Sequence, residues 1–250
     1  MQSDDDISVI ESVDQFDDPL DRLESVEAKV PSPDPEEMLP KLSDEDPSQR
    51  MLAARACCEL HEPRSIPQLI QLLDDICPLV RVSAAYALGR NTNPEAVAAL
   101  IDLLGRDWNG YVRKGIVWAL GNGGDRTSVP PLIHALKTDI SAVRLWAASS
   151  LAQIAKLEYE DGISAMPPLI EGLRRDAVAA VRGNCAWAIG QLCRELPSNV
   201  VYATAIDALI EALVEDEDYS VKEDAKSALL RVGDPRGMQM IEDLELEGLI

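Results

Sequence analysis

Aromatic residues are scarce in this 250-residue sequence: they make up 4% of the chain, and only one is phenylalanine. Most of the 46% hydrophobic content is Ala, Leu, Val and Ile, and small alanines let helix backbones approach closely in thin layers. The chain is also longer than the usual single-core domain of about 100–150 residues. Length and composition together favour one extended array of helical repeats over two globular domains.

Groups that carry chemistry are also few. The sequence has two histidines and five cysteines, and it contains no CxxC or zinc-finger spacing. It lacks the GxSxG, P-loop and dinucleotide fingerprints of common enzyme classes. We therefore expect a protein that is not an enzyme, with no catalytic residue, no metal and no cofactor. An odd number of unpatterned thiols fits a reducing compartment.

Two further absences limit where the protein works and what it binds. No apolar run approaches the roughly 18–20 residues of a bilayer-spanning helix, and the N-terminus MQSDDDISVI lacks the features of a signal peptide. We expect a cytoplasmic protein without membrane insertion. The 23 basic residues are outnumbered by 44 acidic ones. Because binding to phosphate backbones requires clustered Lys and Arg, nucleic acid is not an expected partner.

The acidic charge is concentrated at the N-terminus. Residues 1–46 hold 16 acidic and 3 basic side chains, so this segment contributes −13 of the total net charge of −21. Residues 1–34 contain few large apolar groups, which predicts a disordered acidic arm ahead of a folded domain at 35–250. The apolar residues of the arm indicate either a short amphipathic docking segment or incidental members of a solvating tail. They are Ile7, Val9, Ile10, Val13 and Phe16.

A short motif, Val-Arg followed by small apolar residues and Ala-Leu-Gly, recurs along the rest of the chain. It reads VRVSAAYALG at 80–89, VRKGIVWALG at 112–121, VRLWAASSLA at 143–152 and VRGNCAWAIG at 181–190, with degenerate copies at 49–58 and 221–230. A Leu-Ile pair precedes the basic residue of five copies by 12 or 13 residues. Two motifs that keep the same offset indicate an internal repeat.

Each repeat predicts a helix A, a turn, a helix B and a second turn. In the second repeat, apolar positions such as Ile66, Leu69 and Ile70 recur at the three- and four-residue spacing of one helical face. Prolines at 67, 130–131 and 167–168 lie at or near the first turn of helix A. One helix pair cannot bury both of its apolar faces, so neighbouring pairs must stack. The sequence therefore predicts an all-α fold, an α-solenoid of about six helical hairpins.

An aspartate lies in the turn before helix B of every repeat. The resulting pattern, Asp followed by Val-Arg and Ala-Ala-x-Ala-Leu-Gly at a period near 31, resembles the short HEAT-like repeats of phycobilisome bilin-lyase subunits and of deoxyhypusine hydroxylase. The resemblance covers residues 36–236. It implies a structural ladder, in which each Arg reaches the Asp or the carbonyls of its own or the adjacent turn. The ladder arginines are Arg81, Arg113, Arg144 and Arg182.

Longer strings extend the resemblance. DWNGYVRKGIVWALGN at 107–122 and LCRELPSNVVYATAIDALIEAL at 192–213 resemble cyanobacterial HEAT-repeat proteins that associate with the iron–sulfur scaffold IscA. That resemblance implies an IscA-type protein partner, whereas the bilin-lyase resemblance implies a phycobiliprotein or its tetrapyrrole. The hydroxylase chemistry is not implied, because it needs several His-Glu pairs and this chain has only His61-Glu62. A lone His134 is expected to be a surface residue.

The cysteines fall at different places in the repeat. Cys57 and Cys185 occupy columns that other copies fill with Leu or Ala, so both should be small core residues. Cys58, Cys77 and Cys193 are harder to place, and the last two are expected near a turn or a helix end, where either can be exposed. If the iron–sulfur resemblance holds, one of them lends a cluster ligand; the alternative leaves the cluster on the partner.

The repeat register also predicts a binding face along helix B. Counted from the basic residue, positions two, five and nine lie on one stripe, which we expect to line the concave side of the solenoid. The stripe is rich in aromatic and amide groups and has no acid in the four central repeats, as is typical of interface centres. The alternative is that the rings merely pack against neighbouring repeats. The expected partner-binding residues are Tyr86, Arg90, Trp118, Asn122, Trp146, Gln153, Asn184, Trp187 and Gln191.

Gly115 and Gly183 lie beside these rings and are expected to open space on the floor of the groove. If the rings contact a partner, replacing Trp118 and Trp187 together with Ala should abolish partner capture and leave melting nearly unchanged. The sequence therefore predicts a non-enzymatic, protein-binding scaffold or adaptor. It acts either with an IscA-type protein in iron–sulfur cluster assembly or regulation, or as a bilin-lyase-type subunit or chaperone that holds a phycobiliprotein or its tetrapyrrole.

Overall fold

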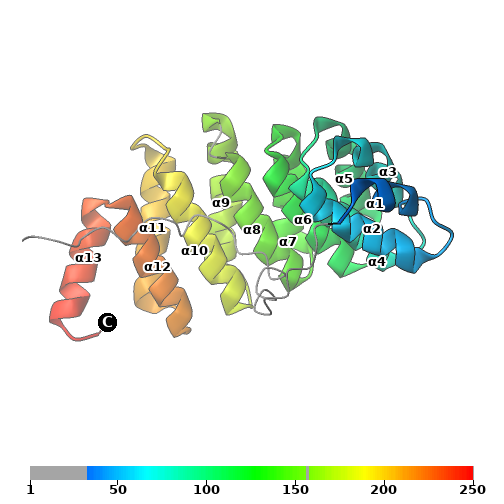
Figure 1. Cartoon of the computed structure of the whole chain (residues 1–250). Helices are drawn as coiled ribbons and strands as arrows, with labels where there is room; N and C mark the ends of the chain where they lie inside the picture. Colours follow the sequence, from blue (N-terminus) through cyan, green and yellow to red (C-terminus); the bar gives the residue numbers. More distant parts are fainter. Residues whose placement is uncertain (1–32, 156–157, 250) are drawn as a thin grey trace, which may run out of the picture. The chain divides into compact units, whose positions relative to one another are not determined.

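The computed structural model describes residues 33–155 and 158–249, and the predicted acidic arm lies outside the described residues except for Pro33 and Asp34. Within the described part the chain forms α-helices and short 3-10 turns, with no β-strand. Figure 1 shows the helices following one another in chain order along a stack. The α-solenoid predicted from the repeats is confirmed.

Six helix pairs in the described residues build the stack, and the second helix of each pair carries the basic residue of the motif. The A helices are α1 (Pro35–Lys41), α3 (Ile66–Leu72), α5 (Pro94–Arg106), α7 (Val129–Thr138), α9 (Tyr159–Arg175) and α11 (Val200–Glu215). The B helices are α2 (Pro47–Leu60), α4 (Pro78–Arg90), α6 (Gly110–Gly123), α8 (Ser141–Ala155), α10 (Ala179–Cys193) and α12 (Tyr219–Val232). Two 3-10 turns, η2 (Pro63–Ser65) and η3 (Arg126–Ser128), precede α3 and α7.

A further helix, α13 (Pro235–Leu246), follows the sixth pair at the end of the stack (Figure 1). It buries Ile241 and Leu244 and contacts both α11 and α12. The repeat motif does not extend to this helix, so the register could not predict it. The helix covers an apolar end that would otherwise face water, as terminal elements of repeat arrays do.

Local sequence signals set many of the helix ends. Asp46 and Asn93 are N-caps whose side chains accept hydrogen bonds from the backbone N–H two residues on, and a proline occupies the next position in both cases. Gly124 and Gly233 end α6 and α12 with φ angles of 64° and 71°. This left-handed conformation suits glycine and closes the helix.

The prediction that Pro167 and Pro168 lie at the start of helix A is wrong. Helix α9 begins at Tyr159, so both prolines lie inside it. A proline inside a helix removes a backbone hydrogen bond, but Met166, Pro168 and Leu169 are buried in the core. Tertiary packing therefore continues the helix through a pair of residues that would break it in isolation.

The B helices form the more closely spaced layer. Consecutive B helices contact one another far more extensively than consecutive A helices do. Small residues permit the approach: a Cβ atom added to Gly89 would lie 2.5 Å from the ring of Trp118, and one added to Gly190 would lie 2.8 Å from the Cβ of Ala228. Because one layer is spaced more tightly than the other, the stack curves toward the B helices, which therefore occupy the concave side.

Candidate protein-binding site

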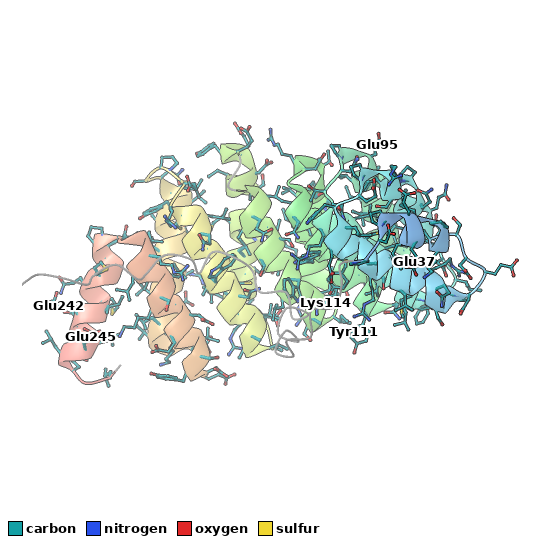
Figure 2. The ribbon with its side chains drawn as sticks, viewed as in Figure 1. Glu37, Glu95, Tyr111, Lys114, Glu242 and Glu245 are labelled. Atoms are coloured by element: carbon teal, nitrogen blue, oxygen red, sulfur yellow. The ribbon has the colours of Figure 1, made fainter. Side chains whose placement is uncertain are left out.

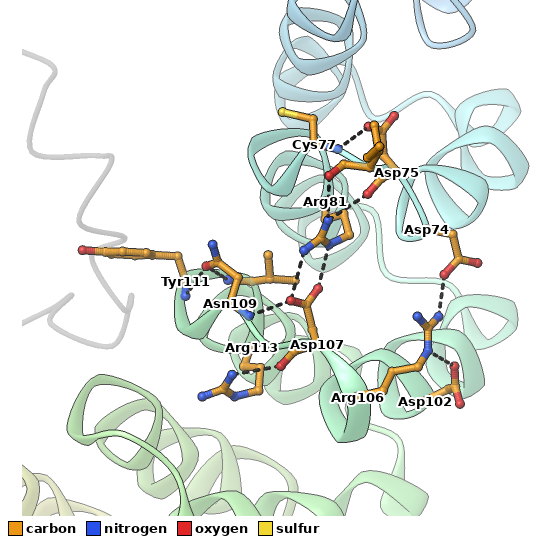
Figure 3. A network of polar contacts seen from close by, with 12 residues as sticks. Asp74, Asp75, Cys77, Arg81, Asp102, Arg106, Asp107, Asn109, Tyr111 and Arg113 are labelled. Carbon is orange, nitrogen blue, oxygen red and sulfur yellow. Dashed lines mark hydrogen bonds and ion pairs between the residues drawn. The ribbon is translucent and has the colours of Figure 1, made fainter.

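A ladder of arginine–aspartate pairs runs along the turns between A and B helices. Arg81 Nε lies 2.6 Å from Asp107 Oδ2, Nη2 lies 3.1 Å from Oδ1, and Nη1 donates over 2.8 Å to the carbonyl of Asp75 (Figure 3). Each arginine thus binds the aspartate of the next turn and a carbonyl of its own. The same pairing joins Arg50 to Asp75, Arg113 to Asp139, Arg144 to Asp176 and Arg182 to Asp216.

The ladder is largely sealed from solvent, with side-chain exposures of 8% for Arg81 and 1% for Asp107. Hydrogen bonds from Arg182 lower the pKa of Asp216 below its ordinary value. Burial raises the pKa of Asp176, but hydrogen bonds from Arg144 and a backbone N–H outweigh it, and the net shift is downward. Both carboxylates are therefore ionised at neutral pH. Their charges are neutralised within the fold and fasten one repeat to the next.

The nine residues expected to bind a partner lie on α4, α6, α8 and α10, but at different depths. Arg90 and Asn122 are exposed, whereas only 7% of Trp118 is exposed. The half-buried members are Tyr86, Trp146, Gln153, Asn184, Trp187 and Gln191.

Trp118 packs against the preceding repeat. Its ring lies against Gly89, and its centroid is 5.2 Å from that of Tyr86, with the two planes inclined at 51°. The equivalent of Gly89 in the repeat before Trp187 is Ala152, whose methyl group leaves less room. Trp187 is half-buried, whereas Trp118 is buried. Trp118 therefore packs against the neighbouring repeat, as the alternative to partner binding predicts.

The expectation that Gly115 and Gly183 open space on the groove floor is wrong. A Cβ atom at Gly115 would lie 3.5 Å from the ring of Tyr86, and one at Gly183 would collide with the carboxylate of Asp224. Side chains of neighbouring helices therefore fill both positions. The Asp224 carboxylate also reaches the fifth repeat from α12, so the acid-free part of the face ends there.

Amide groups of the stripe connect adjacent B helices. Asn184 Nδ2 donates to the carbonyl of Leu145 over 2.6 Å and to Ser149 Oγ over 2.5 Å. Asn122 Nδ2 lies 3.5 Å from the carbonyl oxygen of Gly89. The Asn184 bonds fix the spacing between α8 and α10, and therefore the position of the half-buried rings nearby.

A basic group accompanies the rings of the central repeats. The Lys114 ammonium lies 5.5 Å above the ring of Trp146, a cation–π contact. Arg90 is exposed at the end of α4. The concave face between α4 and α10 thus presents aromatic, amide and cationic groups. This set can bury apolar side chains of a partner and pair with its carboxylates.

Burial determines the properties of three cysteines. Cys57, Cys185 and Cys193 are buried, so Cys193, which the sequence left open between exposed and buried, is a core residue. Burial raises the pKa of Cys185 and of Cys193 to about 12, which keeps both thiols protonated. Cys58 and Cys77 are half-buried. Within residues 33–155 and 158–249, no three His, Cys, Asp or Glu side chains are grouped to hold a metal ion.

The two histidines lie apart from the stripe. His134 is exposed on α7 and contacts Thr138, and His61 ends α2 with a φ of 45°. Beside it, hydrogen bonds from Arg64 lower the pKa of Glu62 to about 2.

Among the helices described, none is both long and apolar enough to cross a bilayer.

A family model described as HEAT repeats matches residues 35–119, 101–165 and 166–246. The chain belongs to the HEAT-repeat family. Its matched segments span every helix pair of the stack, so the family assignment and the fold agree over nearly all of the described chain.

Similar proteins add functional context. The "Uncharacterized phycocyanin operon protein Z" of Pseudanabaena tenuis (strain PCC 7409) is 28% identical over 182 residues, 71% of this chain and 84% of the relative. A chain in the solved complex of CpcE and CpcF of phycocyanin lyase from Nostoc sp. PCC7120 matches with a TM-score of 0.59 and 24% identity. The match covers 87% of this HEAT-repeat chain and 84% of the matched chain. A designed armadillo repeat protein in complex with a (KR)4 peptide has a TM-score of 0.59 and 22% identity, covering 78% and 98%. The two structures show the fold.

The prediction of a binding stripe missed exposed aromatic residues at another place. Trp108 lies in the turn between α5 and α6 and is 78% exposed, and Tyr111 lies in the first turn of α6 and is 76% exposed. Figure 3 shows the Tyr111 ring pointing away from the ladder beneath it. The signal was present in the motif, because the residues between the ladder Asp and Arg carry no charge in the four central repeats.

Proposed function

We propose that this HEAT-repeat protein is a non-catalytic subunit whose concave face binds a phycobiliprotein or its bilin chromophore. The proposal rests on the aromatic, cationic and amide side chains that the concave face presents. Half-buried Trp146 and Trp187 share it with exposed Arg90 and with amide side chains. Half-buried aromatic residues with nearby cations are the groups that contribute most to protein recognition.

Two similar proteins support the choice of partner. The relative from Pseudanabaena is named as a phycocyanin operon protein, and the solved complex from Nostoc is named as part of phycocyanin lyase. A linear tetrapyrrole carries a conjugated apolar system and propionate groups. Stacking on Trp146 or Trp187 suits the first, and Lys114 and Arg90 suit the second.

A binding role rather than a chemical one is favoured by the state of the nucleophiles. Cys185 and Cys193 are buried protonated thiols, and His134 lies on α7, in the other layer of the stack. An IscA-type partner is implied only by the sequence resemblance, and neither the relative nor the solved complex bears on it. An IscA-type scaffold is therefore co-expressed in the experiment as a competing partner.

The experiment is co-expression of the chain with the phycocyanin subunits, with and without bilin synthesis, followed by purification through a tag on the chain. We expect phycocyanin to co-purify with the wild type. Trp146→Ala combined with Trp187→Ala should weaken the measured affinity at least tenfold. His134→Ala, an exposed change in the A-helix layer, should bind as the wild type does.

The colour of the purified chain distinguishes the two ligands. Visible absorbance when bilin is supplied without phycocyanin subunits indicates the tetrapyrrole, whereas capture of colourless subunits indicates the protein. An IscA-type scaffold retained in place of phycocyanin, or equal phycocyanin capture by the double tryptophan variant, would disprove the proposal.

A further inference from the structure

A strip of exposed apolar side chains runs along the turns between A and B helices and the first residues of the B helices in the four central repeats. Single exposed apolar residues are ordinary, but a contiguous row that includes two aromatic rings marks an interaction site. The row, here named the turn strip, consists of Ile76 (89% exposed), Leu79 (62%), Trp108 (78%), Tyr111 (76%), Ile140 (50%) and Val178 (37%).

The ladder places these turns side by side. Arg81, on α4 just after the turn that holds Ile76, binds Asp107 of the next turn, and the two following turns are joined in the same way. Ile140 lies against Gly110, where an added Cβ atom would collide with its side chain. Tyr111 projects from the edge of the stack (Figure 2). With neighbouring helices spaced by about 8–10 Å, the four turns form a surface roughly 25–30 Å long.

The segments that form the strip carry no charge, and some of their backbone donors are occupied. Residues 76–80, 108–112, 140–143 and 177–181 include no charged side chain. The N–H groups of Cys77, Asn109 and Val178 donate to the ladder aspartates over 2.8 to 2.9 Å. Because these N–H groups are taken, a partner strand gains little by adding to this edge, and binding must come from side-chain packing.

Acidic side chains lie at both ends of the turn strip. Glu45 and Asp46 are exposed in the first turn, and Glu217, whose side chain is 90% exposed, lies beside Asp218 in the sixth. A second copy of the chain that placed its own strip here would bring acids against acids in either direction. The charges instead complement a partner with basic ends.

We propose that the turn strip is a docking surface for an amphipathic α-helix of a partner protein. The helix has an apolar stripe about 20 residues long, which matches the length of the strip at 1.5 Å per residue, and Lys or Arg at both ends. The proposal does not depend on what the concave face binds.

The test uses the full chain and a synthetic amphipathic peptide about 20 residues long, with a leucine stripe and lysines at both ends. A second peptide keeps the stripe and carries glutamates at the ends. Dissociation constants are measured by titration calorimetry, and fluorescence follows the exposed Trp108. The variant W108A/Y111A is compared with V200A/L246A, which changes two residues that are 78% and 81% exposed outside the strip.

We expect the lysine-ended peptide to bind the wild type and V200A/L246A alike and W108A/Y111A at least tenfold more weakly. The glutamate-ended peptide should bind the wild type at least tenfold more weakly than the lysine-ended one. Because a net charge of −21 attracts any basic peptide, the difference between the two variants decides the test. Circular dichroism and melting check that both variants fold.

Three outcomes would overturn the proposal. One is equal affinity of the lysine-ended peptide for W108A/Y111A and V200A/L246A. Another is a wild-type dimer in sedimentation that W108A/Y111A dissociates, which would make a second copy the occupant. The last is flotation of the wild type with phosphatidylcholine vesicles that W108A/Y111A abolishes, which would make a lipid surface the occupant of the turn strip.

Discussion

Replacing Asp107 with alanine should lower the free energy of unfolding by about 3–5 kcal/mol, the usual loss when one partner of a buried ion pair is removed. The Arg81 side chain is 8% exposed, and its guanidinium would lose its two contacts with the carboxylate. The N–H of Asn109 would also lose its acceptor at 2.8 Å. Arg81 would keep its bonds to the carbonyls of Asp75 and Ile76, so its charge would remain buried without a counter-charge.

The assay is urea unfolding followed by circular dichroism. The matched control is Asp102→Ala, which removes a carboxylate 2.7 Å from Arg106 in a pair whose side chains are 51% and 67% exposed. That change should cost less than about 1 kcal/mol. In the double variant with Arg81→Met, the buried charge is gone, so the loss should be smaller than the sum of the single losses by about 1 kcal/mol or more. An Asp107→Ala loss no greater than that of Asp102→Ala would refute the reasoning.

Three further predictions concern charge, packing and thiols. Hydrogen bonds from Arg182 lower the pKa of Asp216 below 3.8. The stabilisation of the fold by the Asp216 carboxylate is therefore full above that pH and is lost as the pH falls through the folded-state pKa. In urea titrations, the free-energy gap between wild type and Asp216→Asn should therefore narrow below about pH 4, and a constant gap would contradict the linkage. Trp118→Ala should destabilise the chain by about 3–5 kcal/mol in the same assay, and Trp187→Ala by less; equal losses would contradict the burial difference. With a thiol reagent, we expect Cys58 and Cys77 to react quickly in the folded protein and the three buried cysteines only after unfolding; fast reaction of more than two thiols would contradict their burial.

The helix order was predictable because the repeat motifs are local. In the four central copies the Val-Arg pair, such as Val80 and Arg81, lies in the first turn of helix B, and the preceding aspartate marks the turn. The motif does not distinguish the aspartate of the same turn from that of the next. That choice depends on helix spacing, and Arg81 uses both turns, with the carbonyl of Asp75 on one side and the carboxylate of Asp107 on the other.

The depth of each ring was not predictable from its column. Trp118 and Trp187 occupy the same position in the repeat, but the first faces Gly89 and is buried, whereas the second is half-buried. The sequence predicts open space at Gly183, but the Asp224 carboxylate of the next repeat fills it. In both cases the deciding residue lies on a neighbouring helix, one repeat away in the sequence.

The most direct test of the concave binding face is photo-crosslinking. A photoreactive amino acid replaces Asn122, which is exposed on α6, or His134, which is exposed on α7 in the other layer. Each protein is then irradiated with phycocyanin. We predict a crosslink to a phycocyanin subunit from position 122 and none from position 134. Crosslinking from position 134 alone would contradict the account.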